Sequence, residues 1–246
     1  MKVAIMQPYF FPYIGYFQMI AAVDKFILYD LVSYRKASWM NRNRLFDISK
    51  KEVFYFRAPI RKFSLGTKIR DIELQDVEDW RKKILREVYY NYKRSRFFDE
   101  IFPRLEKVIR FETNSLHKFN TNAISNIAEW VGITTEISFQ NESYLQIEQE
   151  LLIDYSERPE EIKNKRIIRI CESENSTHYV NAIGGMELYD KSYFEQYGIN
   201  LSFIKTDEIK YDQVGEEFIP NLSVLDVLFH NGLIKTGELI KNYRLI

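Results

Sequence analysis

The alternation of short apolar runs with helical patterns constrains the fold of this chain most. An apolar run at 3–6 is followed by a loop rich in Pro and aromatic residues, a helical pattern at 14–23 and a second apolar run at 26–30. A strand, a helix and a strand in this order form a βαβ unit with parallel strands and a right-handed crossover. The alternation returns later, with strands expected at 134–139, 178–181 and 200–204 and helices expected at 157–174, 187–197 and 223–230. We therefore predict an α/β fold of Rossmann-like type, a mainly parallel sheet with helices on both faces.

The middle of the chain departs from this alternation. Residues 31–46 lack periodicity and read as a loop leading into a short strand, and the aromatic run at 53–60 predicts a third strand. From about 76 to 131 the pattern is helical, with Trp80, Ile84, Val88 and Tyr92 on one face and further helices at 98–111 and 115–131. We predict one domain over residues 1–246 with a helical insertion at about 76–131.

Charge and cysteine content narrow the function classes. The chain has 35 basic and 35 acidic residues, so no net field attracts DNA or a membrane surface. No apolar stretch approaches the ~20 residues of a membrane span, and the N-terminus lacks a signal-peptide pattern. We expect a cytoplasmic protein with no DNA partner and no membrane span. With Cys171 as its one cysteine and three dispersed histidines, the sequence predicts no disulfide framework and no metal site. Cys171 lies in an apolar helical pattern and reads as a packing residue. Nothing in the sequence indicates the oligomeric state.

The first candidate site is the loop "QPYFFPYIGY" at the carboxyl end of the first predicted strand. Open α/β sheets bind ligands outside the carboxyl ends of their strands. The loop is expected to form one wall of a nucleotide or sugar pocket. Its candidate binding residues are Gln7, Tyr9, Pro12, Tyr13, Gly15 and Tyr16. The alternative is a hydrophobic turn inserted into the core.

The second candidate site is "HYVNAIGGMELYD", residues 178–190, where a predicted strand runs into two glycines. Glycines at a strand-to-helix turn let the backbone approach a ligand and expose helix N–H groups to an anion. The candidates here are Asn181, Gly184, Gly185 and Tyr189. An ordinary tight turn is the alternative.

Two further segments carry polar candidates. The segment "SYRKASWMNRNR" is a candidate for binding phosphate and stacking on a base. Its candidate residues are Arg35, Lys36, Trp39, Asn41 and Arg42. The alternative is a solvated basic loop. In "IPNLSVLDVLFHNG", Ser223 is expected to cap a helix, with Asp226 as the acid of a capping box. The functional alternative places Ser223, Asp226 and this helix N-terminus beside a phosphate.

Together, "MQPYFFPYIGYFQMI", "DKFILYD", "SWMNRNR", the "YVNAIGG" run and "LSVLDVLFHNG" resemble the WbqC-like family over nearly the whole chain. The resemblance implies a role in making bacterial surface polysaccharide, the O-antigen of lipopolysaccharide or a capsule. The stretch Tyr13-Ile14-Gly15-Tyr16 is also similar in position to the His-x-Gly-His motif of the nucleotidyltransferase superfamily. Gly15 is kept, but tyrosines replace both histidines. A tyrosine donates a hydrogen bond to phosphate and carries no positive charge at neutral pH. This likeness implies a nucleotide-binding fold without the usual adenylyl-transfer groups.

Three functions follow from these resemblances. The first is an acyl or aminoacyl transferase or amide ligase that acts on a nucleotide-linked amino sugar. Its donor is left open, as a free acid with ATP and Mg²⁺, a thioester, or an aminoacyl-tRNA or other carrier. The candidate general bases are Asp30 and His117, the latter expected on a polar helix face. The second is a nucleotidyltransferase for a sugar phosphate, and the third is a non-catalytic scaffold protein of polysaccharide assembly.

Overall fold

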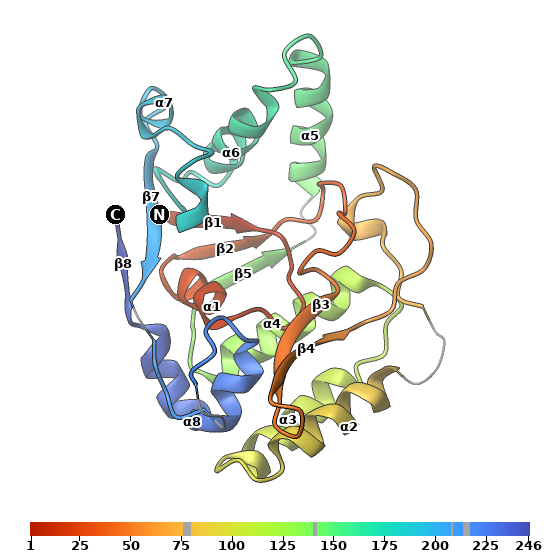
Figure 1. Ribbon diagram of the computed structural model, residues 1–246. Coiled ribbons are helices and arrows are strands. Elements are labelled where there is room, and N and C mark those ends of the chain that lie inside the picture. The colour runs from red at the N-terminus through yellow and green to blue at the C-terminus, as the bar shows by residue number, and fades with distance from the viewer. Residues whose placement is uncertain (76–79, 140–141, 208, 214–216) are drawn as a thin grey trace.

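A computed structural model describes residues 1–75, 80–139, 142–207, 209–213 and 217–246 (Figure 1). In chain order its elements are β1 Lys2–Met6, α1 Ile14–Ala21, β2 Lys25–Leu28, β3 Arg42–Asp47, β4 Glu52–Arg57, η1 Ile69–Asp71, α2 Trp80–Tyr92, α3 Phe98–Ile109, α4 Leu116–Trp130, β5 Glu136–Phe139, α5 Glu142–Asp154, α6 Ile162–Ser173, β6 His178–Ala182, η2 Ile183–Gly185, α7 Lys191–Glu195, β7 Asn200–Thr206, α8 Val224–Ile240 and β8 Tyr243–Leu245.

Within the described residues the central sheet has six strands in the order β5-β2-β1-β6-β7-β8. The first five are parallel, and β8 joins β7 as an antiparallel edge. Counted along the chain within this sheet, the spatial order is third-second-first-fourth-fifth-sixth. This is the order of doubly wound dinucleotide-binding folds. The predicted Rossmann-like α/β fold is confirmed.

Helices cover both faces of the sheet because its strands are apolar on both sides (Figure 1). Ala4 and Phe26 face a core that also contains α1, α2, α3, α4 and α8. Their neighbours Val3 and Ile27 face a second, separate core with α5, α6 and α7. The two cores therefore lie on opposite faces of the sheet.

The strand expected at 53–60 is β4, which pairs with β3 in an antiparallel hairpin separate from the central sheet. The alternation of buried and exposed residues explains where the hairpin packs. Leu45 and Phe56 are buried against the first core, whereas Tyr55 on the opposite side of β4 is exposed. A hairpin with one apolar face can pack on helices without joining a buried parallel sheet.

The helical insertion expected at 76–131 corresponds to α2, α3 and α4, with 76–79 outside the described residues. Three other expectations need correction. The helix expected at 157–174 is α6, which begins at Ile162. It is preceded by α5, a helix that the sequence pattern did not predict. The helix expected at 187–197 is shorter than predicted and comprises only α7. Helix α8 continues past 230, with a kink at Gly232, where φ is +69°. Among the described residues, no helix combines the length and apolarity that crossing a bilayer requires.

Candidate functional site

A cavity of about 830 Å³ opens at the carboxyl ends of β1, β2 and β6. The connection that leaves β1 packs on one face of the sheet through α1, whereas α5 and α6, which lead into β6, pack on the other. Strands β1 and β6 are neighbours, so the winding reverses between them. Open α/β sheets bind their ligands in the crevice at this reversal. The volume lies within the range of small-molecule and cofactor sites.

Three parts of the chain line the cavity. The strand ends and the η2 turn supply Met6, Gln7, Tyr9, Tyr29, Asn181, Gly184, Gly185 and Tyr189, the facing loops supply Leu31, Ser33, Arg35, Gly66 and Lys68, and α5 and α6 supply Glu148, Leu152, Lys163 and Arg166.

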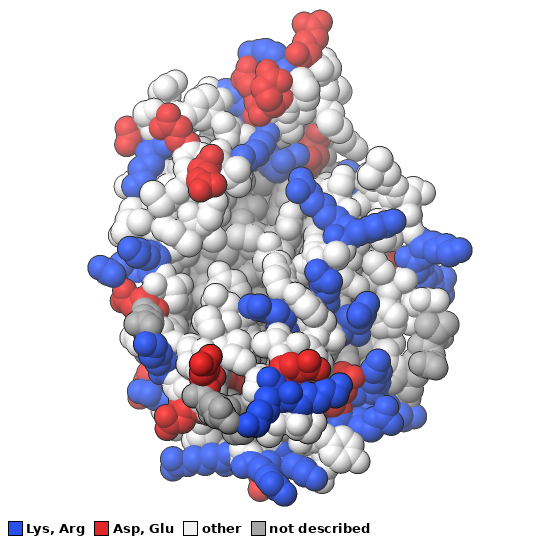
Figure 2. All heavy atoms as spheres, in the orientation of Figure 1, with Lys and Arg blue, Asp and Glu red and all other residues white. Residues whose placement is uncertain are grey.

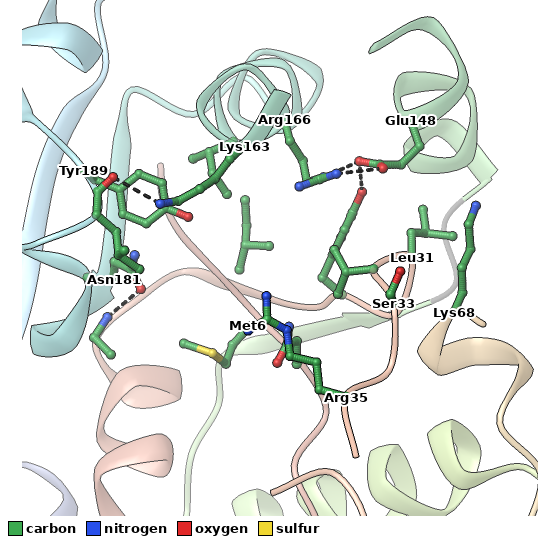
Figure 3. A pocket seen from close by; sticks show the side chains of 18 of the residues that line it. Met6, Leu31, Ser33, Arg35, Lys68, Glu148, Lys163, Arg166, Asn181 and Tyr189 are labelled. Atoms are coloured by element: carbon green, nitrogen blue, oxygen red, sulfur yellow. Dashed lines mark hydrogen bonds and ion pairs between the residues drawn. The ribbon is translucent and has the colours of Figure 1, made fainter. Parts of the chain in front are cut away.

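Basic side chains reach this space from opposite sides (Figure 3). Lys163 and Arg166 extend from α6, while Arg35 and Lys68 extend from the loops across the cavity. Neither Arg35 nor Lys68 makes an ion pair within the part of the chain that the structure describes. Glu148 is the carboxylate in the lining. Four cations against one carboxylate make the site suitable for an anion with more than one negative charge.

Glu148 and Arg166, which both line the cavity, form an ion pair whose carboxylate is buried. Arg166 Nη2 donates to Glu148 Oε2 at 2.9 Å, and Arg166 Nε donates to Oε1. The hydroxyl of Tyr29 donates to the same Oε1 at 2.5 Å. Burial, and then repulsion by the Glu148 carboxylate, raise the pKa of Tyr29, so its hydroxyl stays protonated. Burial lowers the pKa of Arg166, but its interactions with Glu148 and Tyr29 together raise it by more, so the pKa lies above its usual value. The guanidinium of Arg166 therefore stays charged, and its two hydrogen bonds to Glu148 fix its position in the cavity wall.

The η2 turn forms a second wall of the cavity, next to the wall that carries Glu148 and Arg166. Lys163 Nζ lies 4.7 Å from the centre of the Tyr189 ring and donates to the carbonyl of Leu188 at 3.3 Å. Gly185 is required here, because a Cβ at this position would lie 2.5 Å from Nδ2 of Asn181. The glycine lets the Asn181 amide stand at the carboxyl end of β6, beside the cavity.

The aromatic loop after β1 is mostly core rather than pocket wall. Phe10 and Phe11 are fully buried, and both rings pack against Phe56 and Phe119. Pro12 is also buried. The loop contributes only its first part, including Gln7 and Tyr9, to the cavity.

Buried amides from distant elements hold the backbone of this loop. Asn120 on α4 donates to the carbonyl of Pro8 at 2.8 Å. Asn43 on β3 donates to the carbonyls of Phe10 and Phe11 at 3.1 Å and 2.8 Å. Because buried carbonyls need donors, these two asparagines fix the path of the loop from β1 to α1.

The tyrosines of the "YIGY" stretch lie outside the cavity lining. Tyr16 is buried, and its hydroxyl donates to the carbonyl of Gln7 at 2.8 Å. The Tyr13 ring packs on Gly15, where a Cβ would lie 2.3 Å from the ring. Close packing thus accounts for the glycine, and Tyr16 supports the loop from behind.

The structure brings seven predicted binding residues to one cavity: Gln7, Tyr9, Arg35, Asn181, Gly184, Gly185 and Tyr189. The lining does not include Pro12, Tyr13, Gly15, Tyr16, Lys36, Trp39, Asn41, Arg42, Ser223 or Asp226. Asn41 is used internally, since it accepts from the Tyr34 hydroxyl and donates to the carbonyl of Ala58.

The candidate bases Asp30 and His117 contact each other. His117 Nδ1 lies 3.3 Å from Asp30 Oδ2, and Arg70 Nε lies 3.5 Å from the same oxygen. The expectation of a polar, solvated position for His117 is wrong, because the side chain is fully buried. Burial lowers the pKa of His117 below its usual 6.5, although Asp30 acts in the opposite direction. Neither side chain belongs to the cavity lining.

Ser223 is the N-cap of α8, as predicted. Its Oγ accepts from the N–H of Leu225 and donates to the carbonyl of Phe11 at 2.8 Å. The capping box expected for Asp226 is wrong. Its buried carboxylate instead accepts from the hydroxyls of Tyr92 and Tyr211 at 2.7 Å and 2.6 Å.

Sequence reasoning missed the cavity residues Tyr29, Ser33, Lys68, Glu148, Lys163 and Arg166. A signal existed for two of them. Glu148 falls on the helical stripe formed by Tyr144, Ile147 and Leu151. Arg166 lies on the same face of α6 as Ile162 and Ile170, four residues from each. An ionisable residue within an apolar helical stripe indicates a buried pair or a site.

The sequence profile of the WbqC-like protein family matches residues 7–237. The chain is 30% identical over 234 residues to Rv1507c, an uncharacterised protein of Mycobacterium tuberculosis, and the match covers 94% of each chain. No solved structure matches the chain. Among the described residues, no group of three or more His, Cys, Asp or Glu side chains is arranged to hold a metal ion.

Proposed function

The chain belongs to the WbqC-like protein family, and we propose that it is an enzyme of surface-polysaccharide biosynthesis. In this proposal it binds a nucleotide-linked amino sugar in the cavity beside β1 and β6. It then joins an acyl or aminoacyl group to the sugar's amino group. The observation that carries the proposal is the convergence of Arg35, Lys68, Lys163 and Arg166 on one cavity at the reversal of the sheet winding.

The charges of the site suit the diphosphate of a nucleotide-linked sugar. Arg35 and Lys68 have no ion partner in the described ranges, so their charges are available to a ligand. Arg166 presents a fixed guanidinium because Glu148 holds it from behind. Hydrogen bonds between such cations and phosphate oxygens are about twice as strong as neutral ones.

The sugar's ammonium must lose a proton before its nitrogen attacks the acyl carbon. The Glu148 carboxylate is already held by Arg166 and Tyr29, so we assign this proton to solvent water. The new C–N bond forms as the donor's leaving group departs with the electrons of the broken acyl bond. Holding both reactants in one cavity supplies much of the acceleration, since alignment contributes ~7–11 kcal/mol in favourable cases.

Calorimetric titration with TDP- and UDP-linked amino sugars tests the binding step. Each charged contact contributes ~1.5–3 kcal/mol, so Lys68→Ala should weaken binding roughly 10- to 100-fold. Lys36→Ala is the matched control, because Lys36 is exposed, lies on a neighbouring loop and does not line the cavity. Equal effects of the two substitutions, or no binding by the wild type, would overturn the assignment.

Mass spectrometry then identifies the reaction. Incubation of the sugar nucleotide with an acid and ATP, a thioester, or an aminoacyl-RNA should give a product heavier by the acyl group with one of the three donors. Glu148→Gln should weaken sugar binding, because loss of the carboxylate releases the guanidinium of Arg166. Pyrophosphate release from a nucleoside triphosphate and a sugar phosphate would instead support a nucleotidyltransferase.

A further inference from the structure

The segment "SWMNRNR" leads into a feature that the cavity does not use, the outer face of the β3–β4 hairpin. On β3, Asn43 and Leu45 point into the protein, so Arg42 and Arg44 point outward. In the hairpin register Arg42 stands opposite Arg57 and Arg44 stands opposite Tyr55. We call Trp39, Arg42, Arg44, Tyr55 and Arg57 the hairpin surface.

Two aromatic rings and two guanidinium groups stack on this surface. The rings of Trp39 and Tyr55 are nearly parallel, with centres 6.2 Å apart and an interplanar angle of 25°. The guanidinium of Arg42 lies 4.6 Å from the centre of the Tyr55 ring, and that of Arg44 lies 5.7 Å from Trp39. Trp39 is 39% exposed and Tyr55 is 44% exposed, so both rings keep area for a ligand.

Two arginines of the hairpin surface, Arg42 and Arg44, are held in place, but their charges are not neutralised. Arg42 donates to the carbonyl of Ala37 at 2.7 Å, and Arg44 donates to the carbonyl of Asn221 at 3.0 Å. None of the three arginines makes an ion pair with a described residue. The protein as a whole is neutral, with 35 basic and 35 acidic residues, so this excess is local. Figure 2 shows basic side chains over the region of β3 and β4.

We propose that the hairpin surface binds a short single-stranded stretch of nucleic acid. Exposed aromatic rings provide faces on which bases stack, and fixed arginines contact the phosphates between them. A neutral saccharide would use the rings but leave three charges without partners. The proposal does not depend on the function assigned to the cavity.

The hairpin surface lies near the cavity. Arg35 lines the cavity and Trp39 belongs to the hairpin surface, so four residues of chain join the two. Four residues span at most ~14 Å. If the proposed transferase function holds, a nucleic acid bound here could present an acyl group attached to its end, which makes an RNA-borne donor the favoured one.

Tryptophan fluorescence provides a direct assay with the full chain. Trp39 is the most exposed of the three tryptophans, and a base stacked on it should quench its emission. Titration with a ten-nucleotide single-stranded RNA should saturate with a Kd of ~1–100 μM at physiological salt. Parallel titrations use the DNA strand of the same sequence, the RNA duplex, and inorganic polyphosphate. Tighter RNA binding would identify RNA as the source, and equal RNA and DNA binding would assign single strands in general.

Variants separate stacking from charge. Trp39→Ala should weaken RNA binding about 5-fold or more, because stacking on one ring contributes ~1–3 kcal/mol. Trp39→Phe should keep most of the affinity while it loses the quenching, as followed by fluorescence polarisation of labelled RNA. Arg57→Ala should reduce the salt dependence of log K by ~0.7 for each phosphate that the arginine neutralises. Arg104→Ala, an exposed arginine on α3, is its control.

Three results would overturn the proposal. They are the absence of binding to any single strand, equal binding of polyphosphate and RNA with no effect of Trp39→Ala, and a preference for the duplex. Lys68→Ala, which alters the cavity, should leave RNA binding unchanged. Failure of sugar binding and failure of nucleic-acid binding are therefore distinguishable.

Discussion

Replacement of Asn120 by alanine tests whether the loop after β1 is held by its amide contacts. Asn120 is fully buried on α4, and its amide group donates to the carbonyls of Pro8 and Met40 at 2.8 Å and 2.7 Å. Asn120→Ala leaves both carbonyls without this donor. An orphaned buried polar group costs ~1–3 kcal/mol, so the two carbonyls together cost about 2–6 kcal/mol. The substitution also removes Oδ1, which accepts no hydrogen bond from the described residues, and this offsets part of the loss. We expect a net loss of ~2–4 kcal/mol, a large share of the ~5–15 kcal/mol that stabilises a typical domain.

Urea unfolding followed by circular dichroism measures this loss from the midpoint and slope of the transition. The control is Asn126→Ala on the same helix, where the half-buried amide donates within the helix to Asn122. The control should lose less than ~1 kcal/mol, since a net intramolecular hydrogen bond contributes ~0.5–1.5 kcal/mol. Asn120→Asp should destabilise more than Asn120→Ala, because it turns two donors into an oxygen that faces two carbonyls. If Asn120→Ala and Asn126→Ala lose the same free energy, the reasoning about the loop is refuted.

Three further predictions concern burial and close packing. Because burial lowers the pKa of His117 below 6.5, the unfolded chain binds this proton more readily. The free energy of unfolding should therefore fall as pH falls below 6.5, and His117→Gln should show a shallower decline in urea unfolding at several pH values. Asp226→Asn should destabilise by ~2 kcal/mol or more, since it disturbs a buried carboxylate that accepts two tyrosine hydroxyls; an unchanged midpoint would contradict this. At Gly237 a Cβ would lie 2.6 Å from the carbonyl oxygen of Val131. Gly237→Ala should lower the thermal midpoint, because overpacking costs ~1–3 kcal/mol and exceeds the ~1 kcal/mol gain in helix propensity.

The fold was largely predictable because its elements carry local signals. The parallel sheet with helices on both faces followed from apolar runs that alternate with helical patterns. The two strands of the β3–β4 hairpin were predicted, but an aromatic run does not show which sheet it joins. Helix α5 was missed because Glu148 interrupts a short apolar stripe made by Tyr144, Ile147 and Leu151.

The site was only partly predictable for a related reason. Residues at the ends of strands, such as Gln7 and Asn181, follow from the general rule for open α/β sheets. The roles of Asn43 and Asn120 depend on carbonyls 32 and 112 residues away, respectively. No local pattern predicts such partners. The same holds for Glu148 and Arg166, which meet across two helices.

The walls of the cavity belong to two different hydrophobic cores. The loop that carries Gln7 and Tyr9 is part of the core around α1 and α4, whereas Arg166 belongs to a helix of the opposite core. Sequence changes on α5 and α6 can therefore accumulate without loosening the asparagine contacts around Phe10. Laboratory selection for a changed cavity lining would proceed most readily by varying the α5–α6 segment while the N-terminal loop stays constant.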